Sequence, residues 1–274
     1  MGNAHTSLGK RIGVNGSFSI GGMFSIREQH ALISNSEWQL QTPIVTSGLQ
    51  LRLDAGNPTS YSGTGTTWFD LSGNGFNATL VNSPTWTSAQ SGYFNVSASS
   101  SQTFSVSKPF PNITGQITTE AWVYFNSLPT TGADGTAPTV MHKGSHYTTQ
   151  LTNGAQNYYF ADSSTYSYST YGNRSIAGQI STGAWRQIVT TKDSGNTVRL
   201  YINGSLADTR TAFGNPLTAV DSTLWLIGYS DTDSAPNTSA LITGRFAAAN
   251  VYNRQLSDAE VLTNFNALRG RYGL

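Results

Sequence analysis

The chain has no cysteine and little charge. Its 274 residues include no Cys and only 11% charged residues, and the formal net charge is +1. Without cysteine it can form neither a disulfide framework nor a thiolate metal site. Its Arg and Lys residues are scattered, which argues against a nucleic-acid groove. The polar surface must therefore be built from Ser, Thr, Asn, Gln and Gly, which suit contact with glycans or other subunits better than electrostatic steering.

Long apolar stretches are missing as well. No run approaches the roughly 18 residues that a membrane-spanning helix needs. Gly and polar residues interrupt every hydrophobic stretch through Gln41, so the N-terminus lacks the apolar core of a signal peptide. We therefore expect synthesis in a cytoplasm, with any export by another route, such as assembly into a particle that is released by lysis.

Glutamate is scarce: the chain has only Glu28, Glu37, Glu120 and Glu260. A glycosidase needs two carboxylates about 5–10 Å apart, and a strand presents them on one face at alternate positions. Beside Glu120 these positions hold Thr118 and Trp122. No Gly-x-Ser-x-Gly nucleophile motif occurs either. The sequence therefore predicts a protein that is not an enzyme.

Two histidines, His142 and His146, are spaced four residues apart, as metal ligands on a helix would be. Gly144 stands between them in a β-rich context. We therefore predict that they are solvent-exposed residues of a strand end or turn.

From Leu49 onward the pattern is that of an all-β protein. Leu49, Leu51 and Leu53 alternate with polar residues, as in a half-buried strand. Turn signals recur at short intervals, and the clearest predicts a hairpin over residues 197–209 around Asn203-Gly204. Many short strands with regular turns indicate a β-sandwich or barrel.

One helix is predicted near the C-terminus. Ser257 and Glu260 have the spacing of a capping box, in which each side chain bonds the other residue's backbone. Apolar residues follow at helical spacing, and Gly270 offers a stop. We expect this helix to pack its apolar face against a sheet edge.

Residues 1–46 differ from the rest of the chain. They predict a short hairpin and a short capped helix, which together are too small to bury a core of their own. We interpret them as an N-terminal docking arm, and residues 47–274 as the β-sandwich domain. The apolar side chains predicted to dock onto a partner are Ile12, Val14, Phe18, Ile20, Phe24 and Ile26.

Six segments in order resemble the laminin-G-like branch of the concanavalin A-like lectin/glucanase superfamily. They are Leu51–Gly56, Trp68–Gly75, Thr119–Val123, Trp185–Val189, Tyr201–Gly204 and Val251–Ser257. The resemblance covers most of the chain after Leu49. It implies an antiparallel jelly-roll β-sandwich with a short C-terminal helix, and a habit of binding sugars or proteins. It does not fix a ligand, because a fold alone does not determine function.

The end of the chain, 264–274, and part of the arm, 22–29, look like segments of tailed-phage structural proteins. This resemblance implies a virion structural protein, either a head decoration or a tail fibre or appendage component. Its partners would be other capsid or tail proteins and further copies of itself. The alternative hypothesis is a stand-alone carbohydrate-binding module or adhesin that recognises cell-surface glycans.

Tyrosines crowd a Ser-rich segment, and surface tyrosines among small polar residues make adaptable binding surfaces. The candidate sugar-binding residues are Tyr159, Tyr166, Tyr168 and Tyr171. The alternative is that alternate rings fill a sheet face. Three tryptophans lie inside the family motifs and are predicted to be core residues, namely Trp68, Trp122 and Trp185.

Related domains often hold Ca²⁺ through loop carboxylates and carbonyls, the hard oxygen ligands that it prefers. Asp70 and Asn74 match the family's acidic, Gly-rich turn and are the candidate ligands. However, the family's acidic pair before Val251 is replaced here by Phe246–Ala249. Asp70 could instead cap its own turn through an Asx hydrogen bond. We therefore expect no required metal and no cofactor.

Overall fold

A computed structural model describes most of the chain from Pro43 onward. The described residues are 43–106, 109–127, 139–143, 147–152, 155–160, 180–195, 197–211, 223–227 and 241–274, with the backbone alone described for 147–152, 155–160 and Arg210. By its internal contacts the chain divides into two compact units, Met1–Gln41 and Thr42–Leu274. The six arm residues that we predict to dock lie outside the described residues, so their role stays a prediction.

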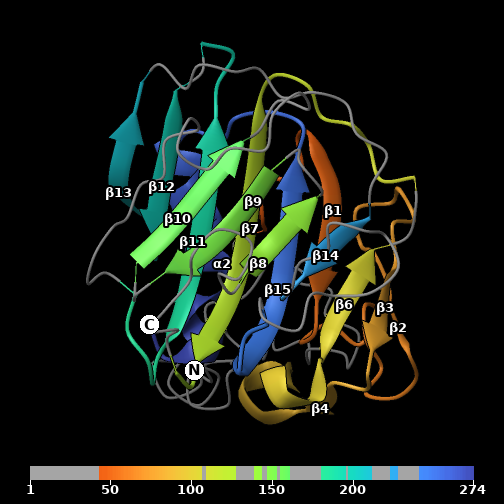
Figure 1. Cartoon of the computed structure of the whole chain (residues 1–274). Coiled ribbons are helices and arrows are strands. Elements are labelled where there is room, and N and C mark those ends of the chain that lie inside the picture. The colour runs from red at the N-terminus through yellow and green to blue at the C-terminus, as the bar shows by residue number, and fades with distance from the viewer. Residues whose placement is uncertain are drawn as a thin grey trace, which may run out of the picture. The chain divides into compact units, whose positions relative to one another are not determined.

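Two antiparallel sheets build the second unit (Figure 1). The strands of sheet A are β1 (Leu49–Asp54), β4 (Thr85–Thr87), β5 (Tyr93–Val96), β7 (Ile117–Phe125), β11 (Trp185–Lys192), β12 (Val198–Ile202), β13 (Ser205–Arg210) and β15 (Gly244–Tyr252). Among the described residues their order is β13-β12-β11-β7-β15-β5-β4, and β1 also pairs with β15. The first strand thus lies beside the last one.

Sheet B faces sheet A. Its strands are β2 (Thr67–Trp68), β3 (Ala78–Val81), β6 (Thr103–Val106), β8 (Thr139–Lys143), β9 (Tyr147–Thr152), β10 (Ala155–Phe160) and β14 (Leu224–Leu226). Among the described residues their order is β10-β9-β8-β14-β6-β3-β2. The predicted all-β sandwich of antiparallel sheets is therefore confirmed.

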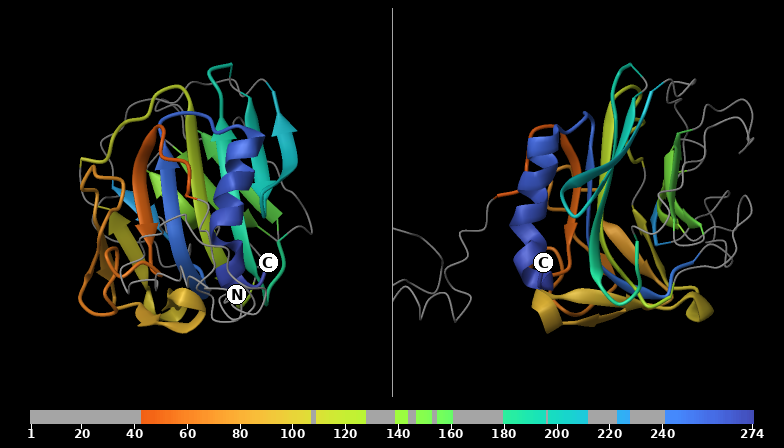
Figure 2. Two further views of the ribbon diagram at one scale, coloured as in Figure 1. Left: turned by 180° about the vertical axis from the view of Figure 1, so that it is seen from behind. Right: turned by 90° about the vertical axis from the view of Figure 1, so that its left-hand side faces the viewer.

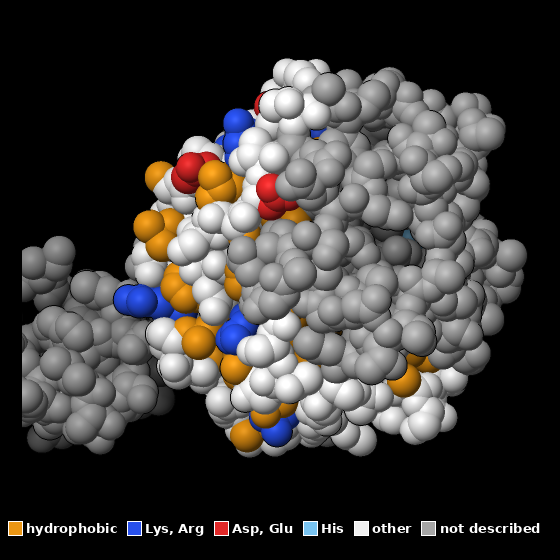
Figure 3. All heavy atoms as spheres, turned by 60° about the vertical axis from the view of Figure 1, so that its left-hand side comes forward, with side chains coloured by type: hydrophobic (Ala, Val, Ile, Leu, Met, Phe, Trp, Pro, Cys, Tyr) orange, Lys and Arg blue, Asp and Glu red, His pale blue; other side chains and the backbone are white. Residues whose placement is uncertain are grey.

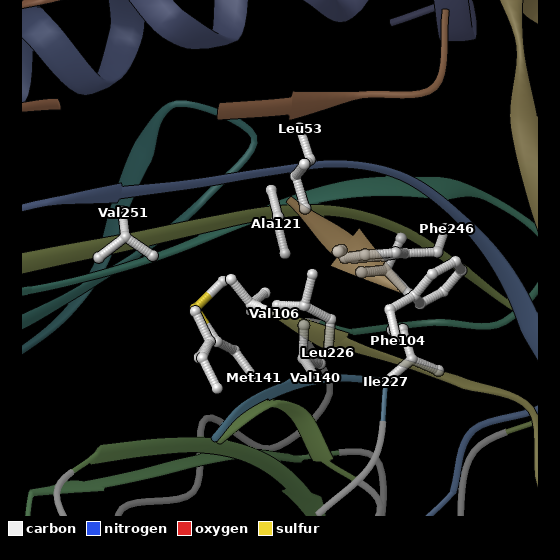
Figure 4. Close-up of a cluster of buried hydrophobic side chains, with 14 of the residues drawn as sticks. Leu53, Phe104, Val106, Ala121, Val140, Met141, Leu226, Ile227, Phe246 and Val251 are labelled. Carbon is white, nitrogen blue, oxygen red and sulfur yellow. The ribbon is translucent and has the colours of Figure 1, made fainter. Parts of the chain in front are cut away.

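The hydrophobic core lies between the two sheets, because alternate residues of each strand point inward. Figure 4 shows Leu53, Phe246 and Val251 of sheet A above Phe104, Val106, Met141 and Leu226 of sheet B. Trp68 joins them: its ring centroid lies 5.2 Å from that of Phe104 and 5.8 Å from that of Phe246. Trp68, Trp122 and Trp185 are all at most 3% exposed, as the sequence predicts.

The hairpin predicted over residues 197–209 is confirmed, and it is formed by β12 and β13. Asn203 and Gly204 both have positive φ, 51° and 75°, as the two central residues of a type I′ turn require. A larger residue would also be too close to the C-terminal helix, since a Cβ at position 204 would lie 3.0 Å from the Phe265 ring. The turn therefore needs glycine for both its backbone conformation and its contact with the C-terminal helix.

That helix is α2 (Asp258–Leu268), continued by the 3₁₀ helix η4 (Arg269–Tyr272). The predicted capping box is present. As expected, α2 contacts an edge strand of sheet A, β13, but it is not confined to the edge. It lies on the face of sheet A that points away from sheet B, over Trp122, Trp185 and Ala248 of the central strands (Figure 2). No helix among the described residues is long and apolar enough to cross a membrane.

Residues just before β1 already belong to the sandwich. Ile44 is only 6% exposed and packs in the same hydrophobic cluster as Phe265. The backbone N–H of Val45 donates to Asn264 Oδ1 of α2 at 2.8 Å. The compact unit therefore begins at Thr42, whereas our sequence boundary placed 43–46 in the arm.

Candidate functional site

Glu120 lies in the middle of β7 and is only 1% exposed. Its Oε1 accepts from Gln187 Nε2 at 2.7 Å, and its Oε2 accepts from Asn250 Nδ2 at 3.1 Å and Asn264 Nδ2 at 2.7 Å. Burial raises the pKa of this carboxyl, and the amide hydrogen bonds partly oppose the shift. Both oxygens are thus occupied and out of reach of a substrate. Glu120 joins β7 to β11, β15 and α2, which is a structural role.

The candidate calcium turn is held together by its own hydrogen bonds. Asp70 Oδ1 accepts from the backbone N–H groups of Arg52 and Ser72, each at 2.9 Å. Its Oδ2 accepts from Ser72 Oγ at 2.7 Å and from the Phe76 N–H at 3.0 Å. This is the Asx-type arrangement that we gave as the alternative to metal binding.

Asn74 is used in a similar way. Its Nδ2 donates to the carbonyls of Leu49 at 3.2 Å and Gln50 at 3.1 Å, which ties the turn to β1. No group of three or more acidic or His side chains suited to a metal occurs in the part of the chain that the structure describes. That the protein functions without Ca²⁺ stays a prediction.

His142 corrects one expectation. It lies within β8 and is 0% exposed, so the prediction of a solvent-exposed turn residue is wrong for it. The physical reason is that β8 extends through Lys143 and is buried along its whole length, so His142 lies inside a buried strand. His146 lies outside the described residues.

One cross-strand row on sheet B contains a predicted sugar-binding residue. Tyr159 lies opposite Thr148, Thr148 lies opposite His142, and His142 lies opposite Trp225. Trp225 is only 4% exposed, so the row is not an open surface at its centre. Tyr166, Tyr168 and Tyr171 lie outside the described residues. Sugar binding by these four tyrosines stays a prediction.

A second row, on sheet A, was not found from the sequence. Arg245 of β15 lies opposite Tyr124 of β7 on one side and opposite Asn95 of β5 on the other. Residues directly opposite in a sheet share a face. That face points away from sheet B, because the adjoining Val123, Phe94 and Phe246 point into the core. We call Tyr93, Asn95, Tyr124 and Arg245 the Tyr–Arg platform.

The guanidinium of Arg245 lies between two tyrosine rings. Its Cζ is 4.3 Å from the ring centroid of Tyr124 and 5.1 Å from that of Tyr93. Both distances are within the range of cation–π attraction. Tyr124 and Arg245 are half-buried and Asn95 is exposed, so the platform is accessible from solvent.

Buried aromatic groups hold the platform in place. The ring of Trp185 lies 5.5 Å from that of Tyr93 and 5.9 Å from that of Tyr124. The indole N–H of Trp185 donates to Gln90 Oε1 at 2.9 Å, and its ring packs 4.5 Å from that of Tyr272. Because the rings beneath are fixed, the platform presents its groups with little freedom left to lose on binding.

The surface around the sandwich is weakly charged. In the view of Figure 3 the described side chains are mostly uncharged, with scattered basic and few acidic groups. This agrees with the 11% of charged residues in the sequence. A positively charged group without a counter-charge therefore stands out from its surroundings.

Comparison with known families shows to which superfamily the chain belongs. A family model described as the concanavalin A-like lectin/glucanases superfamily matches residues 97–262. The chain belongs to this superfamily. The resemblance inferred from the sequence motifs is thereby confirmed, while none of the matches described here concerns a tailed phage. None of the curated proteins matches the sequence.

Solved structures with this fold include two toxin domains. One is the binding domain of Paraclostridial Mosquitocidal Protein 1, with 18% identity, a TM-score of 0.56, and coverage of 80% of this chain and 52% of that one. The other is the ligand binding domain of botulinum neurotoxin serotype D in complex with N-acetylneuraminic acid, with 14% identity, a TM-score of 0.56, and coverage of 81% and 51%. The chain thus spans about half the length of these toxin domains.

A third similar structure is matched over nearly its whole length. It is Domain 4 of an extracellular arabinanase from Geobacillus stearothermophilus in complex with arabinotriose. The identity is 18% and the TM-score 0.57, with 79% of this chain and 97% of that chain covered. At such identities these likenesses show the fold alone.

Proposed function

We propose that the protein is a non-enzymatic carbohydrate-binding module and that the Tyr–Arg platform contacts the glycan. The observation that carries the proposal is the half-buried Arg245 held between the rings of Tyr93 and Tyr124, on an accessible sheet face of a lectin-superfamily sandwich. This is the function that we gave as the alternative to a virion structural role.

The chemistry of the platform suits a sugar. A pyranose or furanose ring has an apolar C–H face that packs on an aromatic ring, and hydroxyl groups at its edge that need hydrogen-bond partners. Tyr124 offers the ring, while the Arg245 guanidinium and the Asn95 amide offer donors. The exposed amide of Asn95 also offers an acceptor. Tyr combined with adaptable polar groups is a common composition of binding surfaces.

The superfamily and its neighbours support a binding role. Two of the similar structures are complexes with a sugar, one with arabinotriose and one with N-acetylneuraminic acid. Glu120, the only glutamate on a described strand, is buried and its oxygens are occupied by amide donors. The arrangement around it therefore favours binding without catalysis.

The first test is a glycan array with the full chain, followed by calorimetry on the strongest glycan. Tyr124→Ala removes one ring of the platform, and we expect it to raise the Kd at least about tenfold, equivalent to about 1.4 kcal/mol. The matched control is Phe69→Ala, which removes a ring that is 50% exposed beside sheet B. We expect it to leave the Kd unchanged.

Two results would contradict the proposal. If no glycan binds in a saturable way, the module does not bind carbohydrate. If a glycan binds but both variants retain full affinity, the site lies elsewhere, and the row containing Tyr159 becomes the next surface to test. A thermal melt of each variant shows whether a lost affinity reflects a lost fold.

The virion role stays a prediction from the sequence, together with its capsid or tail partners, its oligomeric state and its location in a particle. It is compatible with glycan binding, since a fibre that meets a cell surface would use such a module. None of the matches reported above concerns a phage particle.

A further inference from the structure

Resting on the proposed carbohydrate function, we infer that the Tyr–Arg platform selects glycans that carry a carboxylate, with Arg245 as the residue that binds it. The inference depends on three observations: the guanidinium has no counter-charge among the described residues, no free carboxylate lies on its described strand pairings, and two rings fix its position.

Three described arginines form ion pairs, and Arg245 is not one of them. The ion pairs of the described residues join Arg199 to Asp193, Arg254 to Glu260 and Arg271 to Asp54. Arg245 takes part in none of them, and within the described residues its guanidinium donates no hydrogen bond. Its only contacts of this kind are with the rings of Tyr93 and Tyr124.

The nearest carboxylate along the paired strands is already neutralised. Asp54 of β1 lies opposite Ala248, three residues along β15 from Arg245. It is 2% exposed and pairs with Arg271 at 2.7 Å. Its Oδ1 also accepts from the backbone N–H of Gly56 at 2.9 Å. Asp54 is therefore unavailable to Arg245, and the platform keeps its positive charge.

The geometry prepares the guanidinium for a planar anion. A guanidinium that stacks on a ring keeps its N–H donors, which lie in its own plane, free for a ligand. A carboxylate matches this fork with two parallel hydrogen bonds, and such charged pairs are stronger than neutral ones. Asn95, on the other side of Arg245, supplies further donors for the same sugar. The half-buried ring of Tyr124 would then pack against the sugar ring that carries the carboxylate, while Tyr93 is buried and only supports Arg245.

Three other features of the described residues support a functional inference less well than the platform does. The apolar side chains Leu206 and Leu262 are 48% and 46% exposed, but nothing shows what would cover them. Trp225 has a buried indole N–H with no acceptor in the part of the chain that the structure describes, yet its ring is only 4% exposed. The Glu120 network is fully enclosed. Among these features of the described residues, the platform combines access, a fixed cation and a defined ligand chemistry.

The test compares neutral with acidic glycans, and the galactose and galacturonate oligomers are the pair that differs in the acid group alone. The full chain is titrated with lactose, sialyllactose and sulfated lactose, and with a galactose and a galacturonate oligomer of equal length. A hydrogen bond to a charged group is stronger than one between neutral groups. We therefore expect at least one acidic sugar to bind about tenfold or more tightly than its neutral match, with the preference weakened at high salt.

Variants assign the preference to one residue. Arg245→Gln should remove the preference for the carboxylate, so that the acidic and the neutral sugar bind with equal affinity. Arg245→Lys should keep only part of it, because an ammonium lacks the planar fork. The matched control is Arg269→Gln, which removes an equal charge from an exposed arginine of η4 and should leave the preference intact.

The outcomes separate this inference from the proposed function. Equal affinity for acidic and neutral sugars, or a preference that survives Arg245→Gln, overturns the inference but leaves carbohydrate binding intact. Tighter binding of the sulfated sugar than of both carboxylates also overturns it. If Arg269→Gln removes the preference for acidic sugars as fully as Arg245→Gln does, the preference comes from the overall charge of the protein, and the inference is overturned. If neither these sugars nor any array glycan binds, the proposed function fails as well.

Discussion

Glu120 shows how one side chain can connect several elements. Its two oxygens accept from Gln187, Asn250 and Asn264, which lie on β11, β15 and α2. The network extends further, since Asn264 Oδ1 accepts the N–H of Val45 and Gln187 Oε1 accepts the N–H of Gly204. A buried network of this kind is stabilising only when every member has a partner.

Glu120→Gln tests the network. Glutamine replaces one acceptor oxygen by an NH₂ donor, so at least one of the three amide donors loses its partner. A buried unsatisfied group costs about 1–3 kcal/mol. We expect the free energy of unfolding in urea to fall by that amount at pH 7, without a change in glycan affinity. An unchanged unfolding free energy would show that the amides rearrange, and that the network is not specific for a carboxylate.

Two interactions stabilise the first turn of helix α2: a capping box and an ion pair. Ser257 Oγ accepts from the Glu260 backbone N–H, and Glu260 Oε2 accepts from the Ser257 backbone N–H at 2.9 Å. Glu260 also pairs with Arg254 at 2.6 Å. The Arg254 hydrogen bonds lower the pKa of the Glu260 carboxyl to about 2, and those from Ser257 add to the effect.

The pH dependence of stability separates the two interactions. Because the folded pKa of Glu260 lies below its unfolded value, the pair with Arg254 stabilises above about pH 4.5 and is lost as the pH falls towards 2. Glu260→Gln keeps a side chain that can complete the box but removes the charge. We expect it to lower stability by less than about 1 kcal/mol at pH 7, since the pair is partly exposed. At pH 2 the difference from the wild type should vanish.

Ser257→Ala is the matched comparison. It removes the cap itself, so we expect a loss of about 1 kcal/mol at both pH 7 and pH 2. Chemical denaturation at the two pH values measures both variants. If the Glu260→Gln difference persisted at pH 2, the ion pair would not be its cause.

Elements that depend on neighbouring residues could be predicted from the sequence. The β12–β13 hairpin follows from Asn203-Gly204 alone, and the start of α2 follows from Ser257 and Glu260. Both are local, so their residues are read within one short window. The location of α2 over the centre of sheet A could not be read in this way, because it depends on Trp122 and Trp185, which lie far away in the chain.

The candidate site was missed for the same reason. Tyr124 and Arg245 become neighbours only when β7 pairs with β15, and Asn95 joins them only when β5 pairs on the other side. The spacing of Trp122 and Tyr124, two residues apart on a strand, indicated that both lie on one face of the sheet. Nothing in the sequence, however, indicated that Arg245 would lie opposite Tyr124. The row containing Tyr159 likewise needed the registers of three strand pairs.

At the scale of the whole unit, the boundary of the sandwich can be tested by truncation. Residues 42–274 should fold alone with one cooperative melt. Residues 47–274 should be less stable by about 1.5–3 kcal/mol, because they lack the buried Ile44 side chain. They also lack the Val45 bond to Asn264. Equal melting temperatures of the two fragments would show that 43–46 add nothing, and aggregation of both would show that residues 1–41 complete the core.

The pairing of β1 with β15 has a consequence for how the protein is made. β15 is the shared neighbour of β1, β5 and β7, so sheet A cannot close before β15 has left the ribosome. Contacts between residues so distant in sequence also slow folding. Until then the strand edges of β1, β5 and β7 that pair with β15 remain unpaired, and the nascent chain is open to chaperones and to aggregation. Folding of this module is thus a late event of its synthesis, and a stop codon placed before Gly244 should leave an insoluble product.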